Sequence, residues 1–369
     1  MSDQMEVYCV SVPGFEAVLL DEVQQAGFSN ARIDEIGVSF VGEWDDVWKA
    51  NIMLRGATRV LVRVGSFRAM HLAQLDKRSR KFPWDIYLRP DVPIRVEATC
   101  RKSKIYHDKA AKQRFQKAIS ETIGCPIADD ASVVVKVRIF DDLCTISIDS
   151  SGEGLHKRGH KKFVGKAPIR ETMAALCLRA CGYTGEQPVL DPMCGSGTFL
   201  IESAEIAQGM FAGRERTFAF ENLATADASR ISYLKSLSPP ATQANVQFYG
   251  SDRDAGAVKG AMENAGRAGV SHLCQFSTHS VSDVVAPDGP AGIVMINPPY
   301  GTRISNKKAL YALYSSIGKK LRQDFTGWKV GMVTSDPSLV SAMELGQPEQ
   351  KIPFSHGGLK VALYQFKVT

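Results

Sequence analysis

The second half of the chain alternates short apolar runs with longer helical patterns, and this alternation constrains the fold more than any other feature. The runs at 189–190, 246–249, 293–296 and 328–334 read as buried strands, and polar loops and helices separate them. Buried strands joined by helices are typical of a doubly wound parallel sheet. The stretches 351–354 and 359–368 are expected to pair as a hairpin at the edge of that sheet.

The first half has shorter elements and predicts two small α+β modules. Strands are expected at 7–11, 38–41, 59–65, 93–99, 133–140 and 143–149, with helices at 15–25, 45–53, 72–80 and 108–123. The Ser- and Gly-rich stretch 150–154 is the best domain boundary. We therefore predict modules at 1–64 and 65–155, followed by a larger α/β domain at 156–369.

Basic residues are concentrated in two places, although the formal net charge of the whole chain is only +6. Residues 55–120 hold 17 Lys and Arg against 5 Asp and Glu, and residues 156–170 hold six basic residues and no acid. Such polarised charge is the electrostatic footprint of a nucleic-acid binder, although a solvated basic face without a partner has the same composition.

The eight cysteines and seven histidines show no metal-binding or disulfide spacing. No apolar run is long enough to cross a bilayer, and the first residues do not resemble a secretory signal. The expectation is a cytoplasmic, monomeric protein without a metal or a membrane partner.

A glycine loop stands between a short strand and a helix in the sequence Asp191-Pro192-Met193-Cys194-Gly195-Ser196-Gly197-Thr198. Glycines at such a point let the backbone approach a ligand. The third glycine of the dinucleotide fingerprint is absent, because Leu200 stands in its place. The acid Asp191 suits a ligand with positive charge, which favours S-adenosylmethionine over a nicotinamide cofactor. Cys194 is expected to be small packing rather than a nucleophile.

Asp252 directly follows the next strand, where a carboxylate can accept the hydroxyls of a ribose. Asp254 competes for this role, but Asp252 is favoured because it comes directly after the strand. The long interval from the glycine loop to Asp252 implies that residues 209–245 are an insertion or a lid.

The apolar run 293–296 ends on Asn297-Pro298-Pro299-Tyr300. Proline fixes φ and offers no N–H, so the neighbouring carbonyls are held in a fixed direction. An amide oxygen, fixed carbonyls and an aromatic ring together suit a flat base with an exocyclic amine. Taken alone, the tetrad is equally typical of a loop that merely ends a strand.

The order of the glycine loop, Gly250-Ser251-Asp252 and the Asn297 tetrad resembles class I S-adenosylmethionine-dependent methyltransferases. With 148–159, it resembles more narrowly the THUMP-domain RNA guanine-N2 methyltransferases, among them bacterial enzymes of large-subunit (23S) ribosomal RNA. The resemblance implies a Rossmann-like seven-stranded sheet, with its last strand antiparallel, behind ferredoxin-like and THUMP modules.

The resemblance also assigns roles to residues. Asp191 to Thr198 would hold the methionine part of the cofactor, Asp252 its ribose, and Asn297 to Tyr300 the target amine. Ser280 stands where the family commonly has an adenine-binding Asp, and Asp283 is the alternative. Transfer requires alignment and acceptors for the developing charge, and no separate strong base.

Several basic residues are expected to touch RNA, with Arg303 as a contact near the base. The others are Lys157, Arg158, His160, Lys161 and Lys162. Two alternatives remain open. One is adenine-N6 methylation of RNA or DNA, and the other is a non-catalytic RNA-binding factor of ribosome assembly.

Overall fold

The computed structural model describes residues 4–165, 168–239, 246–300, 307–356 and 358–369. The chain divides into two compact units: one holds residues 1–11, 20–155 and 213–237, and the other holds 12–19, 156–212 and 238–369. Within these described ranges, every helix is too short or too polar to span a bilayer.

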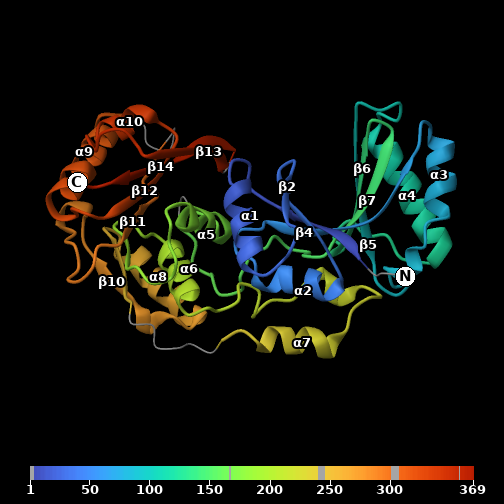
Figure 1. Cartoon of the computed structure of the whole chain (residues 1–369), viewed down its shortest axis with the longest axis horizontal. Helices are drawn as coiled ribbons and strands as arrows, with labels where there is room; N and C mark the ends of the chain where they lie inside the picture. Colours follow the sequence, from blue (N-terminus) through green and yellow to red (C-terminus); the bar gives the residue numbers. More distant parts are fainter. Residues whose placement is uncertain (1–3, 166–167, 240–245, 301–306, 357) are drawn as a thin grey trace. The chain divides into compact units, whose positions relative to one another are not determined.

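The chain up to residue 149 alternates short strands and helices, close to the sequence expectation (Figure 1). The elements are β1 (Met5–Val10), α1 (Glu16–Gln25), β2 (Arg32–Asp34), β3 (Gly37–Gly42), α2 (Trp44–Met53), β4 (Arg59–Arg68), α3 (Leu72–Arg80), β5 (Ile94–Arg101), α4 (Asp108–Ile123), β6 (Val133–Phe140) and β7 (Leu143–Asp149). Helix α4 shows why such an element forms and where it ends. Ala111, Phe115, Ala118 and Ile119 form its buried stripe, and Gly124 ends it in the left-handed conformation at φ 76°.

One seven-stranded sheet, in the order β2-β3-β1-β4-β7-β6-β5, runs through the first unit. The long strand β4 pairs with β1 on one side and with β7 on the other, so it belongs to both small modules expected from the sequence. The pairing of β4 with β7 shifts register between Arg63 and Gly65, where the sequence placed the division between modules. Irregularities of this kind commonly bend a strand and increase its twist.

Residues 213–237 lie between two segments of the second unit in the sequence, but they fold as part of the first unit. They contain helix α7 (Ala228–Ser236). The amide of Phe220 donates to the carbonyl of Ser150 at 3.0 Å, and the guanidinium of Arg230 pairs with Asp45 on α2 at 2.5 Å. An insertion was expected here, and the described part of it is held by hydrogen bonds to the first unit.

The second unit alternates strands and helices over a longer repeat (Figure 1). Its elements are α5 (Glu171–Ala180), β8 (Val189–Asp191), α6 (Thr198–Ala207), β9 (Phe248–Asp252), α8 (Ala255–Ala268), β10 (Cys274–Thr278), β11 (Ile293–Ile296), α9 (Lys307–Asp324), β12 (Lys329–Thr334), α10 (Pro337–Ser341), β13 (Gln350–His356) and β14 (Leu359–Lys367).

These strands form a seven-stranded sheet in the order β10-β9-β8-β11-β12-β14-β13. Neighbouring strands from β10 to β12 are parallel, whereas β14 is antiparallel to both of its neighbours. The predicted α/β class, the antiparallel last strand and the edge hairpin are confirmed.

Alternate residues of the central strands face different helices. Val294 and Ile296 of β11 belong to one buried cluster with Tyr314 and Ile317 of α9. On β12, a Cβ at Gly331 would meet the sulfur of Cys181, directly after α5, at 2.7 Å, so this position faces the other side. Helices therefore cover both faces of the sheet and leave the carboxyl ends of the parallel strands for a site (Figure 1).

Candidate functional site

Three predicted site residues lie at the carboxyl ends of neighbouring parallel strands. Asp191 is the last residue of β8, Asp252 is the last residue of β9, and Asn297 directly follows β11. Both β9 and β11 pair with β8 in parallel, so the three side chains come to the same edge of the sheet. In open α/β sheets this edge is where ligands bind.

The loop between β8 and α6 depends on two glycines in the left-handed region, Gly195 at φ 52° and Gly197 at φ 79°. A Cβ at Gly197 would lie 3.1 Å from the Cβ of Ala261 on α8, so the loop packs closely there. A Cβ at Gly195 would meet nothing within 4 Å. The loop therefore presents bare backbone to open space at Gly195, as close approach of a ligand requires.

Asp252 fixes this loop from the neighbouring strand. Its Oδ2 accepts a hydrogen bond from the amide of Gly195 at 3.1 Å, and its Oδ1 accepts one from the amide of Asp254 at 3.0 Å. A carboxylate has about four acceptor sites, so capacity remains for the hydroxyls of a ligand. Asp254, the competing residue, caps α8 by accepting from the amide of Gly256 at 2.8 Å.

Asp191 is a buried carboxyl group, 3% exposed, whose Oδ1 accepts a hydrogen bond from the amide of Met193 at 3.0 Å. Burial raises its pKa to about 8, the Met193 amide opposes this rise, and the Asp252 carboxylate adds to it. A cation at the loop would favour the ionised form. The chemistry of this position therefore fits a ligand that carries a positive group.

The remaining loop residues differ in exposure, which separates those that a ligand can reach from those that support the loop. Met193 and Gly195 are partly exposed, whereas Cys194, Ser196 and Thr198 are buried. Burial, reinforced by Asp191 and Asp252, raises the pKa of the Cys194 thiol far above its usual range, which fits packing rather than nucleophilic chemistry.

Lys161 supports the loop through its side chain. Its Nζ donates to the hydroxyl of Thr198 at 2.8 Å and to the carbonyl of Ile169 at 3.1 Å, and it pairs with Glu171 at 3.2 Å. Its side chain is 12% exposed. The sequence suggested an RNA contact, whereas in the structure the ammonium group is used inside the second unit.

Two other basic residues of the same segment are also internal. Arg158 is 2% exposed and pairs with the fully buried Glu202 at 3.1 Å, and His160 is 6% exposed with Glu205 at 3.8 Å. Arg158 and His160 therefore offer little surface for the RNA contacts that the sequence suggested. Lys157 and Lys162 are exposed. Arg303 lies outside the described residues.

The Asn297 tetrad ends a fully buried strand. Asn297 is half-buried, Pro298 is buried, Pro299 is half-buried, and Tyr300 is only 5% exposed. An amide and a proline carbonyl at the edge of the sheet suit an amine, as the sequence indicated. The ring of Tyr300, however, must become more exposed before a base can stack on it.

A hydroxyl pair behind the tetrad was not recognised from the sequence. Tyr314 on α9 is fully buried, and its single O–H is shared between Thr334 Oγ1, at the end of β12, at 2.9 Å and the carbonyl of Pro299 at 3.5 Å. Tyr314 lies with Leu310, Ile317 and Leu321 on the buried face of α9, a pattern that by itself indicates only core packing. Its hydroxyl fastens the tetrad to the neighbouring strand.

The two candidates for the adenine contact lie beyond β10. Ser280 is half-buried and its hydroxyl accepts from the amide of Ser282 at 3.2 Å, whereas Asp283 is exposed. A cavity of about 310 Å³ lies beside β9 and β10, but neither Ser280 nor Asp283 lines it. It is lined by Leu190, Tyr249, Gly250, Ser251, Gln275, Phe276, Ser277, His279, Val284, Val285 and Pro287.

Among the described residues, His, Cys, Asp and Glu do not form groups of three or more that could hold a metal ion. The cysteines there are free thiols.

Comparison with protein families gives three matches that together follow the chain. Residues 158–364 match the model described as the RMKL-like methyltransferase domain. Residues 6–61 match the RlmL ferredoxin-like domain, and residues 70–149 match the THUMP domain.

Two curated relatives are similar over most of this chain. A Synechocystis protein named provisionally as an RNA methyltransferase is 28% identical, over 96% of this chain and 94% of its own length. The ribosomal RNA large subunit methyltransferase K/L of Vibrio parahaemolyticus is 30% identical over 95% of this chain, but over only 51% of its own length. The chain thus spans about half the length of the K/L relatives.

Among solved structures, a crystal structure titled as that of a provisionally assigned methyltransferase complexed with SAH is 26% identical with a TM-score of 0.89. The match covers 100% of this chain and 99% of the other. The likeness therefore includes both compact units and not only the catalytic sheet.

Proposed function

Because the chain belongs to the RMKL-like methyltransferase family, we propose that it transfers a methyl group from S-adenosyl-L-methionine to the N2 amine of a guanine in 23S ribosomal RNA. One observation carries the proposal. The parallel strands bring Asp191, Asp252 and Asn297 to one edge of the sheet, and Asp252 holds the glycine loop there.

The chain's own residues fit the cofactor. Asp252 has acceptor capacity for ribose hydroxyls, and Asp191 beside the open face of Gly195 suits the positive amino or sulfonium group. Ser280, with Asp283 as the alternative, is our candidate for the adenine contact. When bound, S-adenosylmethionine supplies a methyl group on a sulfonium as the electrophile.

The tetrad suits the acceptor amine. The Asn297 amide oxygen and the Pro298 carbonyl would accept the two amine hydrogens, which raises the electron density on nitrogen and stabilises the charge that develops there. Tyr314 and Thr334 support Pro299, which keeps these acceptors in place. The alkylated nitrogen is strongly acidic and gives up its proton to water, so a strong base is not required.

Two observations favour ribosomal RNA as the substrate. The chain carries a match to the THUMP domain at 70–149, and relatives of about 30% identity are named as large-subunit ribosomal RNA methyltransferases. These relatives are about twice as long, so their whole activity is not transferred to this chain. We propose that Lys157, Lys162 and Arg303 contact RNA, that the chain acts as a monomer, and that it acts in the cytoplasm.

The test uses RNA from a strain that lacks the gene. Purified protein with S-adenosylmethionine carrying a labelled methyl group should place the label in N2-methylguanosine, as identified by nucleoside mass spectrometry. Label only in N6-methyladenosine would overturn the guanine assignment. Cofactor binding without any transfer would favour the non-catalytic assembly factor. Asn297→Ala should abolish transfer and retain cofactor binding.

A further inference from the structure

One end of the first sheet carries an aromatic side chain in an unusual setting. Tyr106, in the loop between β5 and α4, is 82% exposed. Single exposed apolar residues are common on protein surfaces and need no explanation. Here, however, Met70 at 46% and Phe140 at 36% exposure lie on segments that hydrogen bonds join to the same loop.

The loop is firmly held. The amide of Lys104 donates to Asp142 Oδ1 at 2.8 Å, and the amide of Asp142 donates to Ser103 Oγ at 3.0 Å. The amide of Ala69, after β4, donates to the carbonyl of Asp142 at 2.9 Å. Three segments, namely the end of β4, the β5–α4 loop and the β6–β7 turn, are thereby joined. The surface that carries Tyr106 is formed before any partner arrives, which lowers the entropic cost of binding.

Cations lie on the same three segments as these apolar side chains. Lys102 and Arg138 lie over the ring of Phe140 at 5.7 and 4.8 Å. The acids on and beside these segments are Asp108, Asp141 and Asp142. Asp142 accepts from the Lys104 amide, and Asp108 accepts from the amide of Cys100 and lies 4.0 Å from the Arg101 guanidinium. The exposed cationic side chains on these three segments are Arg68, Arg101, Lys102 and Lys104. We call these four residues, with Met70, Tyr106 and Phe140, the Tyr106 platform.

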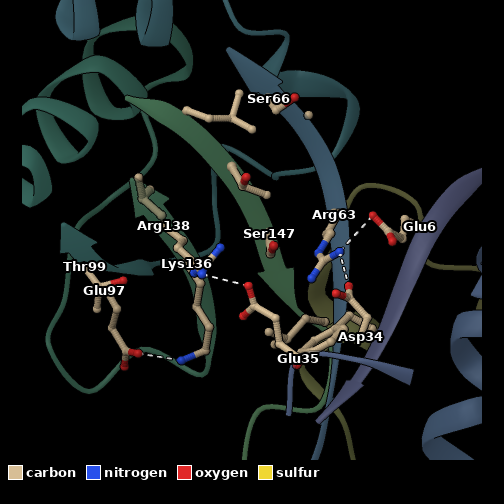
Figure 2. Close-up of a pocket in the computed structure, with 16 residues that line it drawn as sticks. Glu6, Asp34, Glu35, Arg63, Ser66, Glu97, Thr99, Lys136, Arg138 and Ser147 are labelled. Carbon is tan, nitrogen blue, oxygen red and sulfur yellow. Dashed lines mark hydrogen bonds and ion pairs between the residues drawn. The ribbon is translucent and has the colours of Figure 1, made fainter. Parts of the chain in front are cut away.

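The neighbouring face of the same sheet has a different character. A concave pocket of about 590 Å³ lies there, and its charged side chains are already paired with each other (Figure 2). Arg63 bonds Asp34 at 2.7 Å and Glu6 at 3.0 Å. The other pairs are Lys136–Glu97 at 2.6 Å and Arg138–Glu35 at 2.8 Å. Four acids stand against three bases in its lining, so a polyanion gains little in this pocket.

We propose that the Tyr106 platform binds an unpaired nucleotide of the RNA substrate. A base stacks on the exposed ring of Tyr106, while Arg101, Lys102 and Lys104 contact the phosphates beside it. Exposed aromatic rings among cations are the common means of binding single-stranded nucleic acid, because every base has a face on which to stack. The inference rests on the proposed function for the identity of the polymer.

The test is equilibrium binding of the full chain to fluorescein-labelled RNA, measured by anisotropy. The probe is a hairpin with a seven-nucleotide loop, compared with a fully paired duplex of the same stem. Tyr106→Ala should weaken hairpin binding by about five- to a hundredfold, and Tyr106→Phe should retain it. The control is Tyr233→Ala, which removes another exposed tyrosine, 52% exposed on α7, and should have little effect.

The contribution of the lysines is measured separately, through the salt dependence of binding. Lys102→Gln with Lys104→Gln should reduce the slope of log affinity against log salt by about 0.7 for each phosphate that the two lysines neutralise in the wild type. An unchanged slope, or equal effects of Tyr106→Ala and Tyr233→Ala, would overturn the platform, as would a wild-type preference for the duplex. Each variant is first compared with wild type by thermal unfolding.

The binding assay also separates the two proposals. If wild-type protein transfers no methyl group to RNA but Tyr106→Ala still weakens hairpin binding, the proposed function fails and the platform stands. If transfer is normal and the variant binds the hairpin as well as wild type does, the platform fails alone.

Discussion

The Oδ2 atom of Asp252 accepts a hydrogen bond from the backbone amide of Gly195 at 3.1 Å. The end of β9 therefore holds the glycine loop that follows β8. Asp252 therefore shapes the loop, and in the proposed function it has a second task, because it also offers acceptors to the cofactor. A single substitution removes both.

Asp252→Ala is therefore expected to weaken S-adenosylmethionine binding by about ten- to a hundredfold, because hydrogen bonds to charged groups contribute about 1.5–3 kcal/mol. Calorimetric titration of the cofactor checks this. Asp254→Ala is the matched control. It removes the cap of α8 and should lower stability by about 1 kcal/mol while leaving cofactor affinity near wild type. Equal losses of affinity in both variants would argue against a direct role of Asp252.

Asp191 should make the cofactor-free protein less stable as the pH rises. Its pKa is raised from 3.8 to about 8, so between these values the unfolded chain releases a proton that the folded chain keeps. The destabilisation begins near pH 4, grows with pH and is complete above pH 8. Asp191→Asn should therefore raise the melting temperature, relative to wild type, more at pH 8 than at pH 5.

The ligand should reverse this effect, because a cationic group favours ionised Asp191. At pH 7, titration of S-adenosylmethionine in buffers of different ionisation enthalpy should reveal proton release by wild type and less by Asp191→Asn. Equal proton release by both proteins would show that the linked group lies elsewhere.

Tyr314→Phe tests the support behind the tetrad. Removal of the hydroxyl leaves the buried Thr334 without its 2.9 Å donor, which should cost about 1–3 kcal/mol of unfolding free energy and slow methyl transfer. Cofactor affinity should stay unchanged. Tyr311→Phe, on the same helix but 41% exposed, is the control and should transfer at the wild-type rate. Equal rates for the two variants would remove Tyr314 from the positioning of Pro299.

Whether a residue's role could be predicted from the sequence depends on whether its partners are near to it in the chain. Strand ends and glycine loops are local patterns, so the positions of Asp191, Asp252 and Asn297 at one edge were predictable. The course of residues 213–237 was not, because it depends on distant partners such as Asp45, which pairs with Arg230. The internal partners of Arg158 and Lys161 were missed for the same reason. A run of cations looks like a surface until the acids Glu171 and Glu202 are known to lie beneath it.

That correction gives a last prediction, which contrasts two neighbouring cations. Arg158→Met removes the guanidinium that pairs with buried Glu202, so it should lower the free energy of unfolding by about 3–5 kcal/mol in chemical denaturation. Lys162→Ala changes an exposed side chain and should alter stability by no more than about 0.5 kcal/mol, while it weakens RNA binding at low salt. If Arg158→Met unfolds like wild type but has a weaker affinity for RNA, Arg158 contacts RNA after all. Restoration of stability by combining Arg158→Met with Glu202→Met would confirm that the cost arises from an uncompensated buried carboxylate rather than from poorer packing.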